Sequence, residues 1–218
     1  MKRTERRQLK ENELATGLNR FLQWVKIHEK KFMAVAIALM ALLVIMVSVK
    51  LITSYQRSRE ASYLSEVLAL RAELEAKPEN LSRLEKMAEK NKYGRIASLA
   101  LASYYLEKND LDKAEKTLAS VKDRGKDLIH YQILDLYAQV LVKKENYDQA
   151  VNIYGQMEKG KPKSYPLDVV LFHLAETYEK KGDKQQALNL YKDLQTKYQN
   201  TYYGYQAALK AMKLEGSR

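Results

Sequence analysis

The side chains that most often carry chemistry are sparse in this sequence, and their spacing matches no catalytic pattern. It contains no cysteine and three histidines: His28, His130 and His173. His173 opens the segment HLAET, which lacks the second histidine of the HExxH zinc motif. The glycines are scattered, so there is no glycine-rich phosphate loop, and no GxSxG nucleophile motif occurs. We therefore expect no enzyme, no catalytic residue, no metal site, no cofactor and no small-molecule substrate.

A set of residues at fixed distances from three alanines suggests binding rather than catalysis. The alanines are Ala114, Ala150 and Ala187, and most of the set lies fifteen and eleven positions before them. The predicted partner-binding groove consists of Leu99, Ser103, Asp135, Gln139, Phe172, Glu176 and Glu179. The windows around these alanines resemble tetratricopeptide repeats, and this resemblance implies a concave groove along the first helix of each pair that binds a peptide of another protein. Lys143 and Lys180 lie near turns, where we expect them to be outside this groove.

The three alanines belong to three similar windows that predict pairs of antiparallel helices. They are spaced by 36 and 37 residues, slightly more than the 34 of a tetratricopeptide repeat, which the windows resemble. In every window a small residue lies twelve positions before the alanine and a large one four positions after it. The small residues are Ala102, Ala138 and Ala175, and the large ones are Leu118, Tyr154 and Tyr191. Small residues let two helices approach closely, while large ones fill the space toward the next pair.

An uncharged apolar run precedes the repeats and extends from Phe32 to Val49. At about 1.5 Å per residue it makes a helix of roughly 27 Å, close to the thickness of a bilayer's hydrocarbon core. A signal peptide is the competing interpretation, but its apolar region is shorter and follows a short basic start. Here a polar segment of 31 residues comes first. We predict a transmembrane helix over residues 32–52.

Charge predicts the orientation of this helix. Residues 1–31 hold nine Lys/Arg and four Asp/Glu, and basic residues beside a span stay in the cytoplasm. The prediction is a single-pass type II protein of the bacterial inner membrane, with a cytoplasmic N-terminus and a periplasmic C-terminal domain. An apolar stripe between residues 12 and 31 predicts an amphipathic helix that docks either on lipid or on a partner. Elsewhere Lys and Arg alternate with acids, so the net charge of +11 does not indicate nucleic-acid binding.

The resulting prediction is an all-α chain, in which an N-terminal transmembrane helix precedes an α-solenoid of tetratricopeptide-like helix pairs. The transmembrane helix is expected to continue as a stalk until Pro78, and a short helix to follow from Asn80 to Lys90. The alternative for Leu99 is that it only packs against this short helix. The predicted segments are a basic amphipathic segment (1–31), the span (32–52), stalk and leading helices (53–90), three repeats (91–200) and a C-terminal cap helix (201–218).

Two stretches resemble the YfgM-like family of bacterial inner-membrane proteins, which are ancillary subunits of the Sec translocon. They are NKYGRIASLALASYYLEKNDLDKAEKTL (Asn91–Leu118) and TYYGYQAALKAMKL (Thr201–Leu214). The resemblance implies a periplasmic scaffold whose partners are the Sec channel and a membrane-anchored, prolyl-isomerase-like chaperone that acts on exported proteins. The alternative is a structural assembly factor of another envelope complex, such as a division, secretion or pilus machinery.

Overall fold

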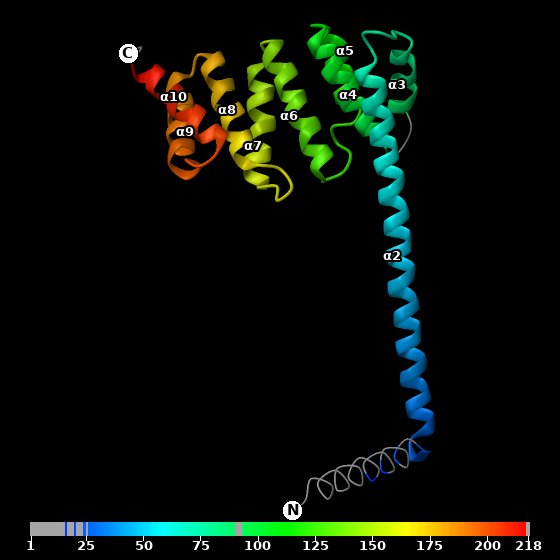
Figure 1. The fold of residues 1–218 in the computed structure, drawn as a ribbon. Helices are drawn as coiled ribbons and strands as arrows, with labels where there is room; N and C mark the ends of the chain where they lie inside the picture. Colours follow the sequence, from blue (N-terminus) through cyan, green and yellow to red (C-terminus); the bar gives the residue numbers. More distant parts are fainter. Residues whose placement is uncertain (1–15, 17–19, 21–23, 25, 90–92, 217–218) are drawn as a thin grey trace, which may run out of the picture. The chain divides into compact units, whose positions relative to one another are not determined.

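The computed structural model describes residues 16, 20, 24, 26–89 and 93–216, and its regular structure consists of α-helices alone within those residues (Figure 1). The predicted all-α fold is confirmed. The chain divides into two compact units, Met1–Arg59 and Glu60–Arg218. Most of the predicted amphipathic segment, residues 12–31, lies outside the described residues.

Helix α2 (Glu29–Ala72) contains the apolar run. Its part from Met33 onward is long and apolar enough to cross a membrane, and none of the most apolar window is buried within the protein. A helix that is apolar on every face without protein around it is typical of a membrane span. The helix ends at Ala72, so the expected continuation to Pro78 is wrong. The chain turns earlier because Leu74, only 3% exposed, folds into the hydrophobic core of the second unit.

The second unit is an α-solenoid of antiparallel helices. After the end of α2 come α3 (Asn80–Glu89), α4 (Gly94–Glu107), α5 (Leu111–Ala119), α6 (Leu128–Lys143), α7 (Tyr147–Gly160), α8 (Leu167–Lys181), α9 (Lys184–Lys197) and α10 (Tyr202–Gly216). Each helix from α3 onward packs against the next, and α4, α6, α8 and α10 also contact one another in order. These four helices therefore form one layer, and α5, α7 and α9 form the other.

The repeat spacing places the same kind of packing at each helix pair. The three alanines that align the windows, the small residues before them and the large residues after them are all at most 1% exposed. The close approach of two helices at an alanine explains why no larger residue occupies these positions.

The turn within each pair also repeats. Asn109, Glu145 and Gly182 occupy the same position of the three turns and have φ angles of 58°, 63° and 92°. The next residue is the N-cap of the second helix, and the side chains of Asp110 and Asp183 accept hydrogen bonds of 3.2 Å from backbone N–H groups of α5 and α9. These caps satisfy N–H groups that a helix leaves unpaired at its start.

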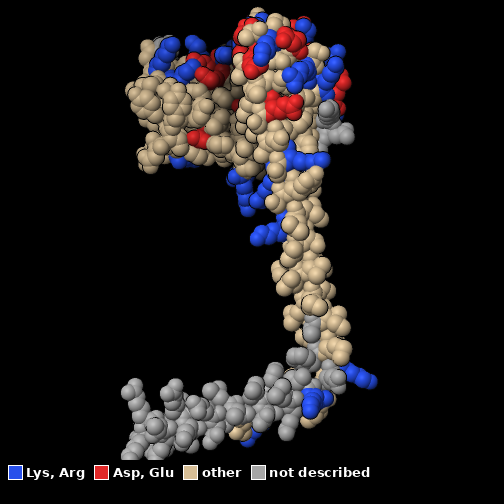
Figure 2. All heavy atoms as spheres, turned by 45° about the vertical axis from the view of Figure 1, so that its right-hand side comes forward, with Lys and Arg blue, Asp and Glu red and all other residues tan. Residues whose placement is uncertain are grey.

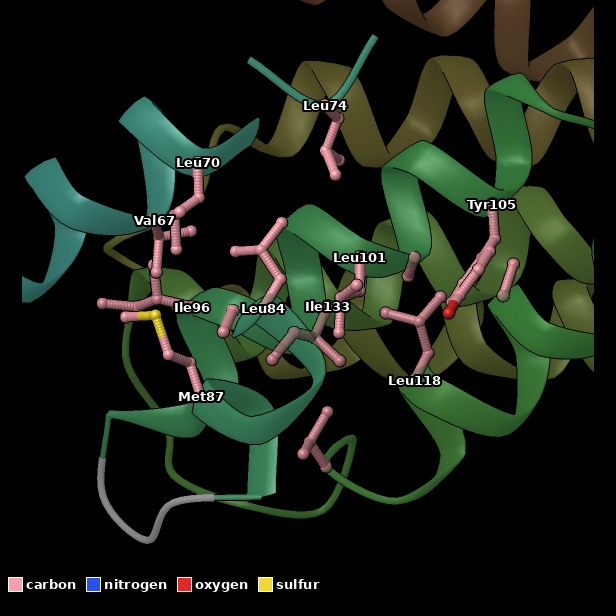
Figure 3. Close-up of a cluster of buried hydrophobic side chains, with 14 of the residues drawn as sticks. Val67, Leu70, Leu74, Leu84, Met87, Ile96, Leu101, Tyr105, Leu118 and Ile133 are labelled. Atoms are coloured by element: carbon pink, nitrogen blue, oxygen red, sulfur yellow. The ribbon is translucent and has the colours of Figure 1, made fainter. Parts of the chain in front are cut away.

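A hydrophobic cluster closes the first end of the solenoid (Figure 3). Val67 and Leu70 of α2 pack with Leu84 and Met87 of α3 and with Ile96 of α4. The Tyr63 hydroxyl donates a 2.6 Å hydrogen bond to the Met87 carbonyl oxygen. The end of α2 and α3 therefore act as a leading helix pair that covers the first repeat.

Candidate functional site

The predicted groove residues of the first repeat are largely covered. Leu99 is partly buried and packs against the cluster formed with α2 and α3. The Ser103 hydroxyl donates a 3.4 Å hydrogen bond to Glu107, which also forms an ion pair with Arg71. The leading helix pair therefore occupies this part of the layer, as the alternative interpretation of Leu99 expects.

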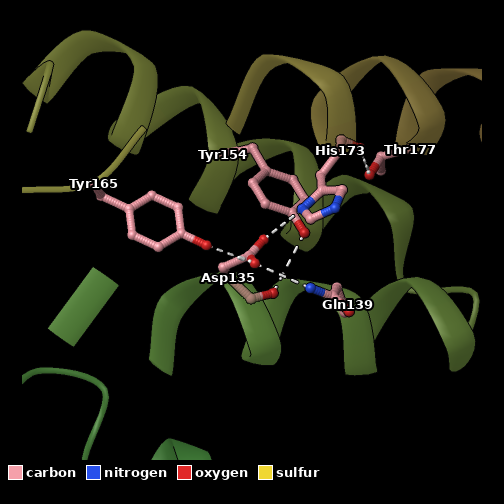
Figure 4. Close-up of polar contacts among 6 residues, drawn as sticks. All are labelled: Asp135, Gln139, Tyr154, Tyr165, His173 and Thr177. Atoms are coloured by element: carbon pink, nitrogen blue, oxygen red, sulfur yellow. Dashed lines mark hydrogen bonds and ion pairs between the residues drawn. The ribbon is translucent and has the colours of Figure 1, made fainter. Parts of the chain in front are cut away.

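In the second repeat, Asp135 is the centre of a buried polar cluster rather than an open groove residue (Figure 4). Its carboxylate accepts hydrogen bonds from Gln139 at 3.0 Å, from the Tyr165 hydroxyl at 2.9 Å and from His173 Nδ1 at 2.7 Å. The Tyr154 hydroxyl donates to the Asp135 backbone oxygen at 3.3 Å. We call these five residues the Asp135 cluster. It joins α6 and α7 to α8 and to the loop before α8.

The electrostatics of the cluster favour an ion pair. Burial by itself would lower the pKa of His173, but the hydrogen bond and negative charge of Asp135 outweigh it, so the pKa is raised. Burial and the neighbouring Asp135 charge raise the pKa of Tyr165 and of Tyr154. Both tyrosines therefore stay neutral hydroxyl donors, Tyr165 to the buried carboxylate and Tyr154 to the Asp135 backbone oxygen, and both of these groups can only accept.

In the third repeat, α10 covers the predicted groove residues. Phe172 is 8% exposed, and its ring lies 5.1 Å from that of Tyr203 in α10. Lys210 of α10 forms ion pairs with Glu176 at 3.4 Å and Glu179 at 3.0 Å. Burial would raise the pKa of Glu179, but Lys210 and the Tyr191 hydroxyl lower it overall. The seven predicted residues are thus brought to one helix layer, yet Asp135 and Phe172 support that layer from within.

A hollow of about 140 Å³ opens between α6 and α8 beside the Asp135 cluster. It is lined by Gln139, Val142, Lys143, Tyr154, His173, Glu176, Thr177 and Lys180. Two predicted groove residues, Gln139 and Glu176, therefore face a common space. Lys143 and Lys180, which are expected from the sequence to lie near turns and outside the groove, line this hollow as well. They lie one helical turn beyond Gln139 and Glu176, and this i, i+4 spacing could have revealed them.

The hollow combines polar side chains that bond to one another with charged groups at its rim. His173 and Asp135 form a hydrogen-bonded pair, but no serine hydroxyl is among the hydrogen-bond partners of His173 in the described part of the chain. The Thr177 hydroxyl donates to the backbone oxygen of His173 at 2.7 Å and is thereby committed to the helix. The described residues also hold no group of three His, Asp or Glu side chains placed to bind a metal ion. Two ammonium groups and one carboxylate at the rim suit a charged peptide segment.

Two family models match the chain. One, described as a tetratricopeptide repeat-like domain, matches residues 23–169, and the other, described as a tetratricopeptide repeat, matches residues 169–201. No curated protein and no solved structure matches it. The first match includes the apolar helix as well as the first two helix pairs.

Proposed function

The chain belongs to the tetratricopeptide repeat-like family, whose repeats indicate a protein-interaction scaffold, and from this we propose a membrane-anchored scaffold of the bacterial envelope. The apolar helix α2 is its anchor. The narrower proposal is that it associates with the Sec translocon and helps a membrane-anchored periplasmic chaperone to act on exported proteins. The sequence resemblance to the YfgM-like family supports this narrower function.

The observation that carries the binding function is the hollow between α6 and α8. Elsewhere in this layer the leading helices cover the first repeat and α10 covers the third. The hollow measures about 140 Å³, which is enough for several water molecules or one side chain of a bound segment. Lys143 and Lys180 at its rim are exposed, so they can meet an acidic side chain of a bound segment.

The test is a charge reversal at the rim, Lys143→Glu with Lys180→Glu. We expect this variant to lose most of its co-purification with the Sec channel and the chaperone from detergent-solubilised membranes. The matched control is Lys184→Glu with Lys213→Glu, which changes the same charge at exposed lysines outside the hollow and should retain the partners. Helicity by circular dichroism should be equal in both variants.

Three outcomes would contradict parts of this proposal. Equal loss in both variants would assign the binding to non-specific electrostatics. Loss only after deletion of residues 12–31 would move the docking site to the N-terminal segment. Recovery of division, secretion or pilus components in place of the Sec channel would favour the structural assembly factor.

Orientation needs a separate test. The basic N-terminal segment motivates the proposal that the repeat domain is periplasmic. Alkaline phosphatase fused after Arg218 should then be active, because it folds only in an oxidising compartment. An inactive phosphatase together with a fluorescent cytoplasmic reporter at the same position would overturn both the orientation and the localisation.

A further inference from the structure

The two edges of the solenoid carry positive charge in different ways. The turns within the helix pairs lie at one edge, and the loops between pairs, 120–127 and 161–166, lie at the other (Figure 1). We call these the turn edge and the loop edge. In Figure 2 blue and red atoms alternate over the upper part of the repeat domain.

Three lysines of the turn edge are neutralised by neighbouring carboxylates, whereas Lys143, Lys180 and Lys184 near the same turns form no ion pair among the described residues. Lys108 pairs with Glu75 at 2.7 Å, Lys144 pairs with Asp112 at 2.6 Å, and Lys181 pairs with Asp148. These pairs join residues of successive helix pairs or of the leading segment. The positive charge of these three lysines is therefore neutralised within the protein.

Cations of the loop edge have no such partners among the described residues. The exposed, unneutralised side chains are Arg124, Lys126, Lys159, Lys161 and Lys163. The acids of the first loop are already engaged, since Asp123 pairs with Lys122 at 2.7 Å and Asp127 with Arg95 at 2.6 Å. The loop edge therefore presents several cations to an external anion.

The second basic loop is held in a fixed conformation. Lys161 has a left-handed φ of 41°, and its N–H donates to the Met157 carbonyl at 3.1 Å. At the other end of the loop, the Tyr165 hydroxyl is tied to Asp135 in the buried cluster. Lys159, Lys161 and Lys163 thus project from a backbone that is fixed at both ends.

Within the second unit, the loop edge lies near Glu60, the first residue of that unit. Arg95 donates to the Arg124 carbonyl at 3.0 Å and to Asp127, and the charge of Glu60 in α2 acts on the same guanidinium group. From Lys50 to Arg59 the connection is about ten residues, or about 15 Å as a helix. The headgroup layer takes about 5–8 Å of that length, and electrostatic attraction reaches about 8 Å at physiological salt.

We propose that the loop edge binds the anionic phospholipid headgroups of the membrane that anchors the chain. Clusters of lysine and arginine beside a span attract anionic lipid in this way, and the attraction falls with salt. The repeat domain would then rest with its loop edge on the bilayer and leave the turn edge free. This surface is independent of the hollow between α6 and α8.

The absence of cysteine allows a direct test on the full chain. A single cysteine at Ser164→Cys in the loop, or at Lys184→Cys on the turn edge, carries a fluorophore in protein reconstituted into vesicles with a headgroup-level quencher. We expect stronger quenching at position 164 in phosphatidylcholine vesicles that contain phosphatidylglycerol than in phosphatidylcholine alone. The increase should disappear at high salt, and position 184 should show none.

A charge variant separates this surface from general basicity. Lys159→Gln, Lys161→Gln and Lys163→Gln together should reduce quenching at position 164 to the level of phosphatidylcholine alone. Arg124→Gln with Lys126→Gln should reduce it partly. The matched control removes the same number of charges from the turn edge, Lys108→Gln, Lys144→Gln and Lys181→Gln, and should leave the quenching unchanged.

Two results would overturn the proposal. The first is quenching at position 164 that does not depend on phosphatidylglycerol or that survives the triple loop substitution. The second is that a fluorophore at position 164 is shielded from solvent in native membranes but not in any vesicle. This result would indicate that the loop edge binds an acidic protein instead of lipid.

Discussion

The first helix pair and the contact between α6 and α8 use the same repeat position in opposite ways. Leu99 and Asp135 both lie fifteen residues before the alanine that aligns their repeat. Leu99 packs into an apolar cluster with the leading helices, whereas Asp135 binds His173, Tyr165 and Gln139. One contact is apolar and covered, and the other is polar and adjoins the hollow.

The difference shows that repeat position fixes where a side chain points, while its neighbours decide which side chain fits. An apolar surface from α2 and α3 accepts Leu99. A buried carboxylate is costly unless hydrogen-bond donors surround it, and Asp135 meets three side-chain donors. The α6–α8 contact therefore depends on a specific set of hydrogen-bond donors around Asp135. The contact of Leu99 with the leading helices depends mainly on the apolar surface area that it buries.

The largest expected effect comes from removing the centre of the Asp135 cluster. Asp135→Ala leaves His173 and Tyr165 without their acceptor, and we expect the free energy of unfolding to fall by about 3–5 kcal/mol. Leu99→Ala at the half-buried equivalent position should cost less, about 1–2 kcal/mol. Urea unfolding of residues 60–218 followed by circular dichroism measures both. Equal losses would mean that the two contacts do not differ in kind.

Enlarging the alanine at the crossing within each helix pair should lower the stability by a similar amount in every pair. The contacts between the first helices of successive pairs, in contrast, should differ from one another. Ala150→Leu and Ala187→Leu should each overpack a fully buried crossing and cost about 1–3 kcal/mol. Ala114→Leu should cost a similar amount, because its packing is the same. Melting temperatures would show this, and unchanged values for Ala150 and Ala187 would contradict the repeat alignment.

A pH titration sharpens the comparison further. The pKa of His173 is raised from 6.5 in the folded state, so its stabilising contribution is complete below about pH 6.5. That contribution is lost as the pH rises through the folded-state pKa. Stability of the parent should therefore fall over this range relative to His173→Gln. Asp135→Asn should flatten the dependence, whereas Leu99→Ala should retain it.

The smallest expected effect concerns the turns. Glu145 has a φ of 63° at the position that Gly182 occupies in the next pair. Glu145→Gly should stabilise the domain by about 0.5–1 kcal/mol, because a left-handed conformation strains a residue with a Cβ atom. Gly182→Ala should destabilise it for the same reason. A lower melting temperature for Glu145→Gly would show that the strain is already relieved by other contacts.

The sequence determined the helix pairs because their signals are local. The apolar run and the small and large residues at fixed distances from each alanine act within one helix or between two consecutive helices. The packing positions could therefore be predicted from counting alone. Which protein partner binds, and whether the predicted groove takes a peptide, are not local properties and stay predictions.

Only the tertiary structure decided which side chains in the layer of α4, α6, α8 and α10 are covered and which line the hollow. Tyr165 and His173 reach Asp135 from 30 and 38 residues away, and the repeat spacing of 36 and 37 does not specify which side chains bond across successive helix pairs. The early end of α2 has the same origin, because burial of Leu74 outweighs the helical preference of the residues before Pro78. Lys143 and Lys180 continue the helix faces of Gln139 and Glu176, which the i, i+4 spacing predicts, but only the packing of α6 beside α8 placed the two faces around one hollow.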